Sequence, residues 1–295
     1  EMKKEIFKGA GTAISTPFEG GEVNYKAYDR LLDYQLDNDI DAIIVCGTTG
    51  ESATMDSDEK KRLIEHTLEK VDGRAKVIAG TGGNNTKEAI AMSKFADSIG
   101  VDGLLVVTPY YNKATQDGLI KHYNLIANSV NTPIIAYNVP SRTGVNITPE
   151  TCKKLSEIPN INAIKEASGN ISQVAKIAAL CGDDLNIYSG NDDQIIPVLA
   201  LGGKGVISVL SNVMPFYTHQ MVMEYLDGHI DSARQMQLDV LDLCEALFSE
   251  VNPIPVKEAL NQMGFDFGEP RMPLTPMSRD KAKVLTKSLQ NHHLL

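Results

Sequence analysis

INAIKEASG, residues 161–169, is a short apolar run that ends in a polar turn signal. Its length and its bounding Asn and Gly residues are typical of a buried strand, which we expect over residues 161–165. Lys165 closes this strand. The polar residues that follow it predict a turn at the carboxyl end of the strand, where α/β proteins place their functional residues.

Seven other runs of the same kind are spread along the chain. Each is short, apolar or β-branched, and bounded by Gly, Pro, Asn or Asp, as buried parallel strands are. They lie at residues 10–14, 42–45, 76–79, 103–107, 133–137, 185–188 and 205–208.

Helical patterns fill the gaps between these strands. Asn24, Ser57 and Thr86 each begin one, and Thr148 caps another whose first turn contains Pro149. Regular alternation of strands and helices predicts a parallel sheet. Eight such units in about 210 residues fit an α/β protein with a (β/α)8 TIM barrel.

The chain after this pattern reads as helical. We expect residues 1–214 to form the barrel with the active site, and residues 215–295 to form a C-terminal helical region packed on the barrel. Residues 232–247 are amphipathic, and another helix begins near residue 255. No linker rich in Ser, Gly or Pro separates the two parts.

The composition excludes several classes of function. A net charge of -10 and the lack of Lys/Arg-rich blocks argue against nucleic-acid binding. The N-terminus has no apolar segment of a secretory signal, and no apolar run is long enough to cross a membrane. The four cysteines are scattered, without a C-x-x-C pair, so we expect reduced thiols and a cytoplasmic protein.

Lys165 is the strongest candidate for a catalytic residue. A lysine at the end of a buried strand is poorly solvated, which disfavours the charged ammonium. A neutral amine attacks carbonyl groups and forms a Schiff base. The alternative is a lysine whose stem packs on the strand while its ammonium reaches water.

Polar residues also follow other predicted strands. Thr48 and Thr49 lie in a glycine-bounded turn whose amides suit an anion such as a carboxylate. Tyr137 ends the strand before that of Lys165 and could transfer protons at an imine there. Arg142 offers a planar fork for a second carboxylate. Taken singly, these residues would read as helix caps, packing and a surface ion pair, but strand ends of a barrel converge on one face.

Three long motifs resemble those of a known family. GTTGES (47–52), YNVPSRTG (137–144) and IKEA (164–167) are similar to signatures of the pyruvate-dependent class I aldolase superfamily. Within it, the chain most resembles the dihydrodipicolinate synthase family. The resemblance covers nearly the whole chain, including NPIPVK at residues 252–257.

The resemblance implies a role for each site residue. Lys165 would form the Schiff base with pyruvate, and Tyr137 would shuttle protons through Thr49 to Tyr111 of a neighbouring subunit. Thr48 and Thr49 would hold the pyruvate carboxylate, and Arg142 that of aspartate 4-semialdehyde. Gly190 and Ile207 would line the pyruvate pocket through their backbone carbonyls.

The resemblance also implies the reaction. Pyruvate and L-aspartate 4-semialdehyde would condense to 4-hydroxy-tetrahydrodipicolinate, in lysine and diaminopimelate biosynthesis. Because the lysine is the covalent catalyst, no metal or organic cofactor would be needed, and the six histidines form no zinc-binding pattern. The alternatives are a sister aldolase, namely N-acetylneuraminate lyase or 2-keto-3-deoxygluconate aldolase, and a non-catalytic barrel that binds an oxo acid.

Assembly and regulation are implied in the same way. The family resemblance suggests a dimer of dimers, because Tyr111 would complete the site of a partner. Lysine-inhibited relatives bind lysine in a pocket that would correspond here to Ser52, Ala53, Asn84, Glu88 and Tyr110. Ser57 and Lys60 depart from the inhibited pattern, so we expect weak or absent lysine inhibition.

Overall fold

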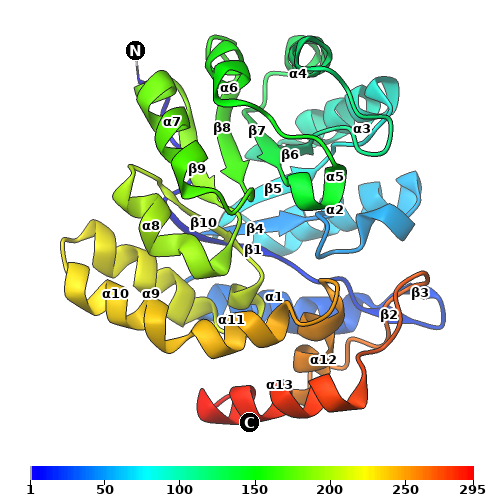
Figure 1. Cartoon of the computed structure of the whole chain (residues 1–295). Coiled ribbons are helices and arrows are strands. Elements are labelled where there is room, and N and C mark those ends of the chain that lie inside the picture. Colours follow the sequence, from blue (N-terminus) through cyan, green and yellow to red (C-terminus); the bar gives the residue numbers. More distant parts are fainter. Residues whose placement is uncertain (1) are drawn as a thin grey trace.

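A computed structural model of the chain describes residues 2–295. Eight parallel strands close into a barrel in the order β1-β10-β9-β8-β7-β6-β5-β4 (Figure 1). The strands are β1 Gly9–Ala13, β4 Ala42–Val45, β5 Lys76–Gly80, β6 Gly103–Val107, β7 Ile134–Asn138, β8 Ile161–Glu166, β9 Asn186–Ser189 and β10 Gly205–Ser208. The predicted (β/α)8 barrel is confirmed, and each strand lies within one residue of its predicted bounds.

Eight helices surround the barrel. They are α1 Tyr25–Asp37, α2 Ser57–Val71, α3 Thr86–Ile99, α4 Gln116–Ser129, α6 Pro149–Ser156, α7 Ile171–Cys181, α8 Ile195–Ala200 and α9 Pro215–Leu226. Asn24 accepts a hydrogen bond from the Ala27 amide, and Thr148 accepts one from the Thr151 amide. These side chains satisfy amides that a helix start leaves unpaired, as the sequence predicts.

Short elements lie in the connections between the strands and the helices. They are the four-residue helix α5 Pro140–Thr143 and the 3-10 turns η1 Ser52–Thr54, η2 Gly182–Asp184, η3 Asp192–Gln194 and η4 Leu210–Asn212. A small antiparallel hairpin, β2 Phe18–Glu19 and β3 Glu22–Val23, follows β1. Gly20 and Gly21 form its turn with positive φ angles of 59° and 82°, which suit a two-residue hairpin turn.

The C-terminal part is helical, with α10 Ile230–Asp239, α11 Leu241–Leu247, α12 Ile254–Gln262 and α13 Arg279–Asn291. The amphipathic stretch at 232–247 is two helices rather than one, with Val240 as their junction. The helix that begins at Pro215, α9, packs on β1 and α1 and completes the outer ring of the barrel. Of the helices that follow it, α10 packs on α8 and α9, α12 packs on α13, and α13 lies outermost (Figure 1).

Two apolar layers hold the fold together. The interior of the barrel is filled by side chains that point inward, among them Ile44, Ile78, Ile135 and Ala163. Tyr188 stacks on Phe7, which precedes β1, and the two rings belong to the same cluster. The other face of each strand packs against the helices. Because successive side chains of a strand point to opposite faces, each strand end offers one side chain to the barrel mouth and the next to the helix layer. None of the helices in residues 2–295 combines the length and apolar character that crossing a membrane requires.

Candidate active site

Lys165 and Tyr137 are neighbours across the β7–β8 pair. They occupy the same position in the strand register, and Tyr137 lies in the cluster of side chains that fills the barrel. The Lys165 side chain is 6% exposed, and its Nζ lies 4.0 Å from the centroid of the Tyr137 ring. Among residues 2–295, no carboxylate forms an ion pair with this nitrogen. The geometry gives a buried amine beside a phenol.

The residues that follow them, Asn138 and Glu166, point to the helix layer. Asn138 Nδ2 donates to Glu166 Oε1 at 3.0 Å, and Gln173 Nε2 donates to Glu166 Oε2 at 2.9 Å. Burial raises the pKa of the Glu166 carboxyl, although these hydrogen bonds oppose the shift. This network ties the ends of β7 and β8 to helix α7, and thereby fixes where Tyr137 and Lys165 enter the cavity.

Thr48 and Thr49 lie in the turn after β4. The Glu51 amide donates to the Thr48 carbonyl at 2.9 Å, and Glu51 has a left-handed backbone with φ of 61°. Thr49 is buried, and its Oγ1 accepts a hydrogen bond of 2.9 Å from Asn252 Nδ2. Thr48 is partly buried and faces a smaller adjoining cavity.

The C-terminal region holds this turn in place. Lys257 forms an ion pair with Glu51 in which both side chains are at most 2% exposed. Burial lowers the pKa of Lys257, whereas Glu51 acts to raise it. The backbone amide of Arg271 donates to the other oxygen of Glu51 at 2.9 Å. The Glu51 carboxylate is therefore bound on both oxygens by residues more than 200 positions away in the chain.

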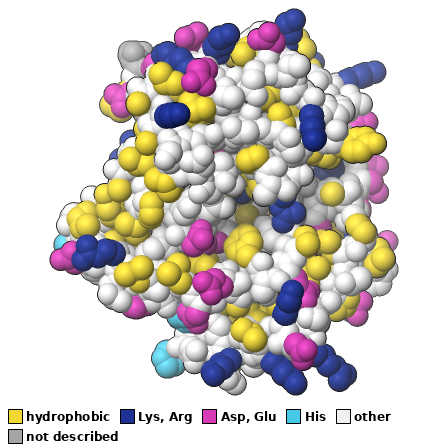
Figure 2. Space-filling model, in the orientation of Figure 1, with side chains coloured by type: hydrophobic (Ala, Val, Ile, Leu, Met, Phe, Trp, Pro, Cys, Tyr) yellow, Lys and Arg dark blue, Asp and Glu magenta, His cyan; other side chains and the backbone are white. Residues whose placement is uncertain are grey.

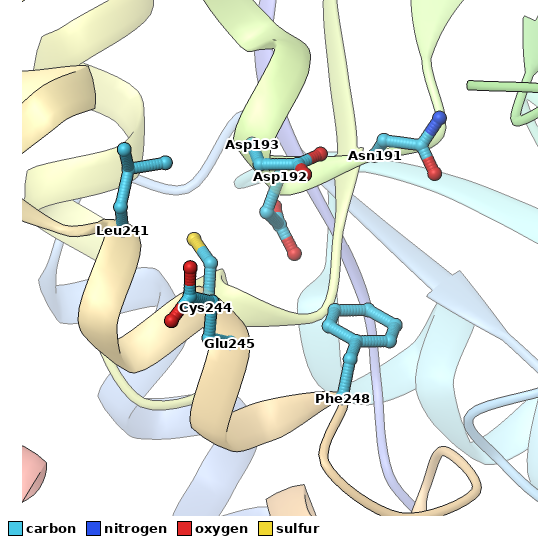
Figure 3. A pocket seen from close by; sticks show the side chains of 7 residues that line it. All are labelled: Asn191, Asp192, Asp193, Leu241, Cys244, Glu245 and Phe248. Atoms are coloured by element: carbon cyan, nitrogen blue, oxygen red, sulfur yellow. The ribbon is translucent and has the colours of Figure 1, made fainter.

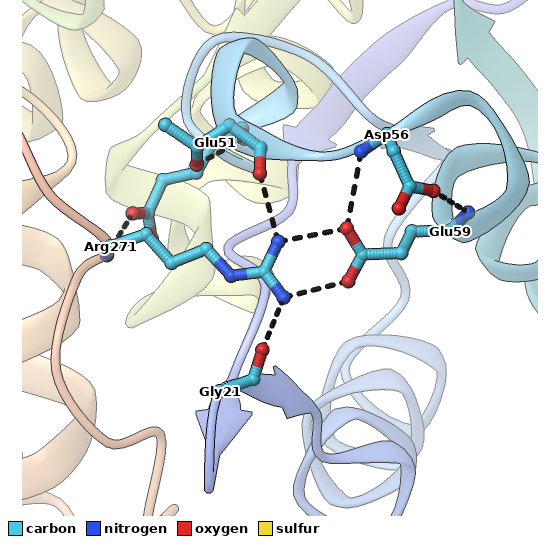
Figure 4. Close-up of polar contacts among 6 residues, drawn as sticks. Gly21, Glu51, Asp56, Glu59 and Arg271 are labelled. Carbon is cyan, nitrogen blue, oxygen red and sulfur yellow. Dashed lines mark hydrogen bonds and ion pairs between the residues drawn. The ribbon is translucent and has the colours of Figure 1, made fainter.

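Arg271 binds three further partners (Figure 4). Its guanidinium makes a bidentate pair with Glu59, at 2.9 and 2.6 Å, and donates to the carbonyls of Thr54 and Gly21. The hydrogen bonds from Arg271 lower the pKa of Glu59. This pairing joins the start of α2, the β2–β3 hairpin and the C-terminal region around the turn that carries Thr48 and Thr49.

Arg142 lies in α5, directly after β7. Its Nη2 donates to the backbone carbonyl of Asn252 at 2.9 Å. Gly190 directly follows β9 and Ile207 lies in β10, and both line the cavity at the barrel mouth. A Cβ on Gly190 would lie 2.6 Å from the Cβ of Ala167, so the close approach of the chain after β8 requires glycine at this position.

One cavity of about 610 Å³ at the strand ends brings most of the predicted site together. Figure 2 shows the molecular surface hollowed near the middle of this face. The residues that line this cavity include Thr49, Tyr137, Arg142, Lys165, Gly190 and Ile207. The cavity therefore contains an amine, a phenol, a hydroxyl and a guanidinium from three separate segments of the chain.

A second cavity of about 370 Å³ adjoins the first and is acidic. Figure 3 shows the side chains of Asp192, Asp193 and Glu245 around it, with Asn191 and Phe248 at the side shared with the larger cavity. Asp192 is buried and accepts hydrogen bonds from Ser208 Oγ and two backbone amides. Burial raises the pKa of its carboxyl.

Tyr111 lies apart from the cavity of its own chain. Its side chain is 91% exposed, and its φ of 74° is unusual for a tyrosine. The loop around it is nevertheless held, because Asn84 Nδ2 donates to the Tyr110 carbonyl and Asn112 Nδ2 donates to the Asn84 carbonyl. The loop therefore presents Tyr111 to the outside.

The predicted lysine pocket divides between two adjoining cavities. Asn84, Glu88 and Tyr110 line one of about 530 Å³, together with Ser57 and Lys60. Ser52 and Ala53 line a smaller cavity of about 210 Å³ that shares Lys60 and Tyr110 with the first. The structure thus places all of these residues near one another, and it places the charge of Lys60 between the two groups.

Sequence reasoning missed the contribution of the C-terminal region to the cavity. The connection between α11 and α12, residues 248–252, forms part of the lining. Asn252 belongs to the NPIPVK segment noted for its family resemblance, which was the only available signal. Nothing in the spacing of these residues predicts that they return to the strand ends.

Comparisons with known proteins agree with one another. Residues 6–292 match the model of the Dihydrodipicolinate synthetase family. The chain is 57% identical over 285 residues to a 4-hydroxy-tetrahydrodipicolinate synthase of Caldicellulosiruptor saccharolyticus, which covers 96% of each protein. A crystal structure of dihydrodipicolinate synthase from Thermotoga maritima is 45% identical with a TM-score of 0.97, covering 99% of this chain and 100% of that one. A lysine-bound structure of the Cyanidioschyzon merolae enzyme is 41% identical with a TM-score of 0.96, covering 99% of this chain and 100% of that one.

Proposed function

The chain belongs to the Dihydrodipicolinate synthetase family, and we propose that it condenses pyruvate with L-aspartate 4-semialdehyde to 4-hydroxy-tetrahydrodipicolinate. This makes it a class I, Schiff-base lyase of lysine and diaminopimelate biosynthesis. The observation that carries the proposal is the buried Lys165 amine beside the Tyr137 ring, in a cavity that also contains Thr49 and Arg142. Such a constellation suits imine chemistry on a small oxo acid.

The reaction begins at Lys165. Its amine adds to the ketone carbon of pyruvate, and water leaves as the imine forms. Tyr137 lies beside the nitrogen and moves protons in this step and in the loss of a methyl proton that gives the enamine. Thr48 and Thr49 hold the pyruvate carboxylate, and the Gly190 and Ile207 carbonyls line the pocket around it. The lysine is the covalent catalyst, so the chemistry calls for no metal or organic cofactor.

The second half of the reaction forms the carbon–carbon bond. The enamine carbon attacks the aldehyde of aspartate semialdehyde, whose carboxylate binds Arg142. The amine of the semialdehyde then attacks the imine carbon, closes the ring by transimination and releases Lys165. The assay that tests the proposal compares turnover of pyruvate with aspartate semialdehyde against cleavage of N-acetylneuraminate and 2-keto-3-deoxygluconate. Turnover of a sugar acid alone would assign a sister activity, and no turnover of any of them would leave an oxo-acid-binding barrel.

Arg142→Ala should damage use of aspartate semialdehyde far more than imine formation with pyruvate. Losing a charge-assisted contact to a carboxylate costs about 1.5–3 kcal/mol, or roughly a 10- to 150-fold fall in kcat/KM for the semialdehyde. Steady-state kinetics and borohydride trapping of the pyruvate adduct measure the two effects separately. Arg74→Ala is the control, because Arg74 pairs with Asp37 on the exposed surface. An equal loss of pyruvate adduct in Arg142→Ala would contradict this role.

Tyr111 leads us to propose a homodimer as the smallest active unit, and a dimer of dimers as the assembly. The exposed Tyr111 side chain contributes nothing to the cavity of its own chain, and its unusual backbone conformation is typical of functional positions. Within a partner's site it would extend the proton path from Tyr137 and Thr49.

Mixing two inactive variants tests this exchange. Lys165→Ala and Tyr111→Phe subunits should regain activity when combined, because the Lys165→Ala subunit still donates its own Tyr111. With equal amounts of the two variants, half of the dimers contain one subunit of each kind. One of the two sites in such a mixed dimer is intact, so about one site in four of the whole sample should be active. Mixing Lys165→Ala with Tyr137→Phe is the control and should stay inactive, since both residues serve their own chain. A fully active monomer in sedimentation would refute the exchange.

Lysine inhibition should be weak or absent, with half-inhibition above a millimolar. Asn84, Glu88 and Tyr110 suit an amino acid, but Lys60 lies in both cavities of the pocket. Repulsion between two ammonium groups at about 4 Å approaches roughly 4 kcal/mol at an effective dielectric of 20. Lys60 is only partly buried, so its side chain can reduce this repulsion by moving away. Ser57 cannot offset it with a charge. Losing one to two kcal/mol weakens binding by roughly tenfold.

Activity against added L-lysine at saturating substrates measures this effect. The double variant Ser57→Glu/Lys60→His should become more sensitive to lysine, because it removes a positive charge and adds a negative one. Half-inhibition of the unaltered protein below a millimolar would show that the two positions are unimportant.

We place the protein in the cytoplasm. Cys46, Cys152, Cys181 and Cys244 are free thiols, all buried, and reduced thiols are the usual state of cysteine in that compartment.

A further inference from the structure

Asn252 lies where the C-terminal region meets the active-site cavity. It lies in the connection between α11 and α12 and lines the cavity together with Thr49 and Arg142. The residue is 7% exposed, so its polar groups depend on partners within the protein. It contacts two of the proposed functional residues, and it does so with two different groups.

The side chain of Asn252 binds the threonine of the proton path. Its Nδ2 donates to Thr49 Oγ1 at 2.9 Å. A threonine hydroxyl has one hydrogen to donate and two lone pairs to accept with. Because Asn252 occupies a lone pair, the Thr49 hydroxyl hydrogen stays available for another acceptor, and the oxygen is held in one place.

The backbone of Asn252 binds the arginine of the second carboxylate site. Its carbonyl accepts a hydrogen bond of 2.9 Å from Arg142 Nη2. This contact persists whatever side chain occupies position 252. The two roles can therefore be separated by mutation, because a change of side chain removes only the contact with Thr49.

The remaining polar atom of Asn252 has no partner. Among the buried side-chain atoms of residues 2–295, Asn252 Oδ1 is one of four that lack a hydrogen bond. An unpaired buried carbonyl destabilises the folded state. An apolar residue of similar size would avoid this cost, so the amide is poorly explained by stability alone.

We propose that Asn252 is a positioning residue for the condensation, whose side-chain amide orients the Thr49 hydroxyl for proton transfer while its backbone carbonyl orients Arg142. This rests on the function proposed above, in which Thr49 relays protons to and from the imine site. The C-terminal region thereby takes part in the chemistry of the barrel. The Asn252 side chain acts on kcat and on the exchange of the pyruvate methyl protons, and not on the KM for the aldehyde.

The decisive experiment is a double-mutant cycle with Thr49→Val. Asn252→Asp keeps the shape, but its carboxylate accepts the Thr49 hydroxyl hydrogen instead of donating to the oxygen. Asn252→Leu removes both polar groups. We expect each to lower kcat, and the rate of deuterium exchange into the pyruvate methyl group, by about tenfold or more. The KM for aspartate semialdehyde should change less than about threefold, because the Arg142 contact uses the backbone.

In the Thr49→Val background, the same Asn252 substitutions should have little further effect, since the hydroxyl that they act on is gone. Asn261→Asp is the matched control. This asparagine of α12 is partly buried, donates to the Gly268 carbonyl and does not line the cavity, so its replacement should leave kcat unchanged. Thermal unfolding identifies any variant whose fold is altered. If Asn252→Leu is such a variant, the kinetics of the isosteric Asn252→Asp test the proposal without it.

Additive losses in the cycle, an unchanged kcat in Asn252→Asp, or a rise in KM without a fall in kcat would each overturn the proposal. Turnover by the unaltered protein keeps this result separate from the proposed function. If the unaltered protein condenses pyruvate with the semialdehyde and the cycle is additive, the function stands and the role of Asn252 is wrong.

Discussion

Lys165→Ala should abolish the pyruvate adduct that borohydride traps in the unaltered protein, and condensation should fall by at least about three orders of magnitude. The reason is that the Lys165 amine is the group that bonds to pyruvate, and the cavity offers no substitute at the same place. The nitrogen lies at the barrel mouth, within 4.0 Å of the Tyr137 ring centroid. Mass spectrometry of the reduced protein measures the adduct, and peptide mapping locates it.

Lys3→Ala is the control for this experiment. Lys3 is also partly buried, but its Nζ donates to backbone carbonyls, including that of Ile161, at the opposite end of β8. Burial lowers the pKa of Lys3, as it would for a reactive amine. The Lys3→Ala variant therefore tests whether partial burial of a lysine is enough for it to form the adduct. The variant should keep the full adduct. An adduct in Lys165→Ala that maps to any other lysine would show that Lys165 is not the nucleophile.

Lys257→Met should destabilise the protein by about 3–5 kcal/mol, because it leaves the Glu51 carboxylate buried without its cation. Both side chains of the pair are at most 2% exposed, so water cannot replace the missing partner. Urea unfolding followed by circular dichroism measures the change. The Thr48–Thr49 turn should also move, since Glu51 anchors it, and activity should fall with stability.

Removing both charges of the pair should destabilise the protein less than removing one of them. Lys257→Met/Glu51→Gln leaves no buried ion, and the amide oxygen still accepts from the Arg271 amide. Lys70→Ala is the exposed comparison, because Lys70 and Asp33 pair at 3.5 Å on the surface, and its effect should stay within about 1 kcal/mol. A loss for Lys257→Met no larger than that of Lys70→Ala would mean that the buried pair contributes little.

The strands were predictable because each signal is local. The run 161–165 is apolar, short and bounded by turn residues, and the structure extends it by one residue to Glu166. The caps at Asn24 and Thr148 were predictable for the same reason, since a cap depends on residues within one turn. Convergence of Lys165, Tyr137 and Arg142 followed from the barrel itself, which places all carboxyl strand ends on one face.

What the sequence could not reveal depends on distant contacts. The β2–β3 hairpin has two-residue strands, too short for an alternating pattern, although its Gly20-Gly21 turn was visible. The junction at Val240 carries no glycine or proline, so one helix was expected where two occur. Asn252 contacts Thr49 from 203 positions away, and no periodicity in the sequence encodes such a contact.

The contacts of Arg271 have a consequence for how the protein is made. Its amide closes a loop of 220 residues when it binds Glu51, and contacts of such long sequence separation form late in folding. During synthesis the eight strands leave the ribosome first and can close into a barrel. The turn that carries Thr48 and Thr49 acquires its final anchors only after residue 271 has been added. A nascent chain whose barrel is complete but which lacks Arg271 should therefore still be inactive, because the Glu51 anchor of this turn is missing.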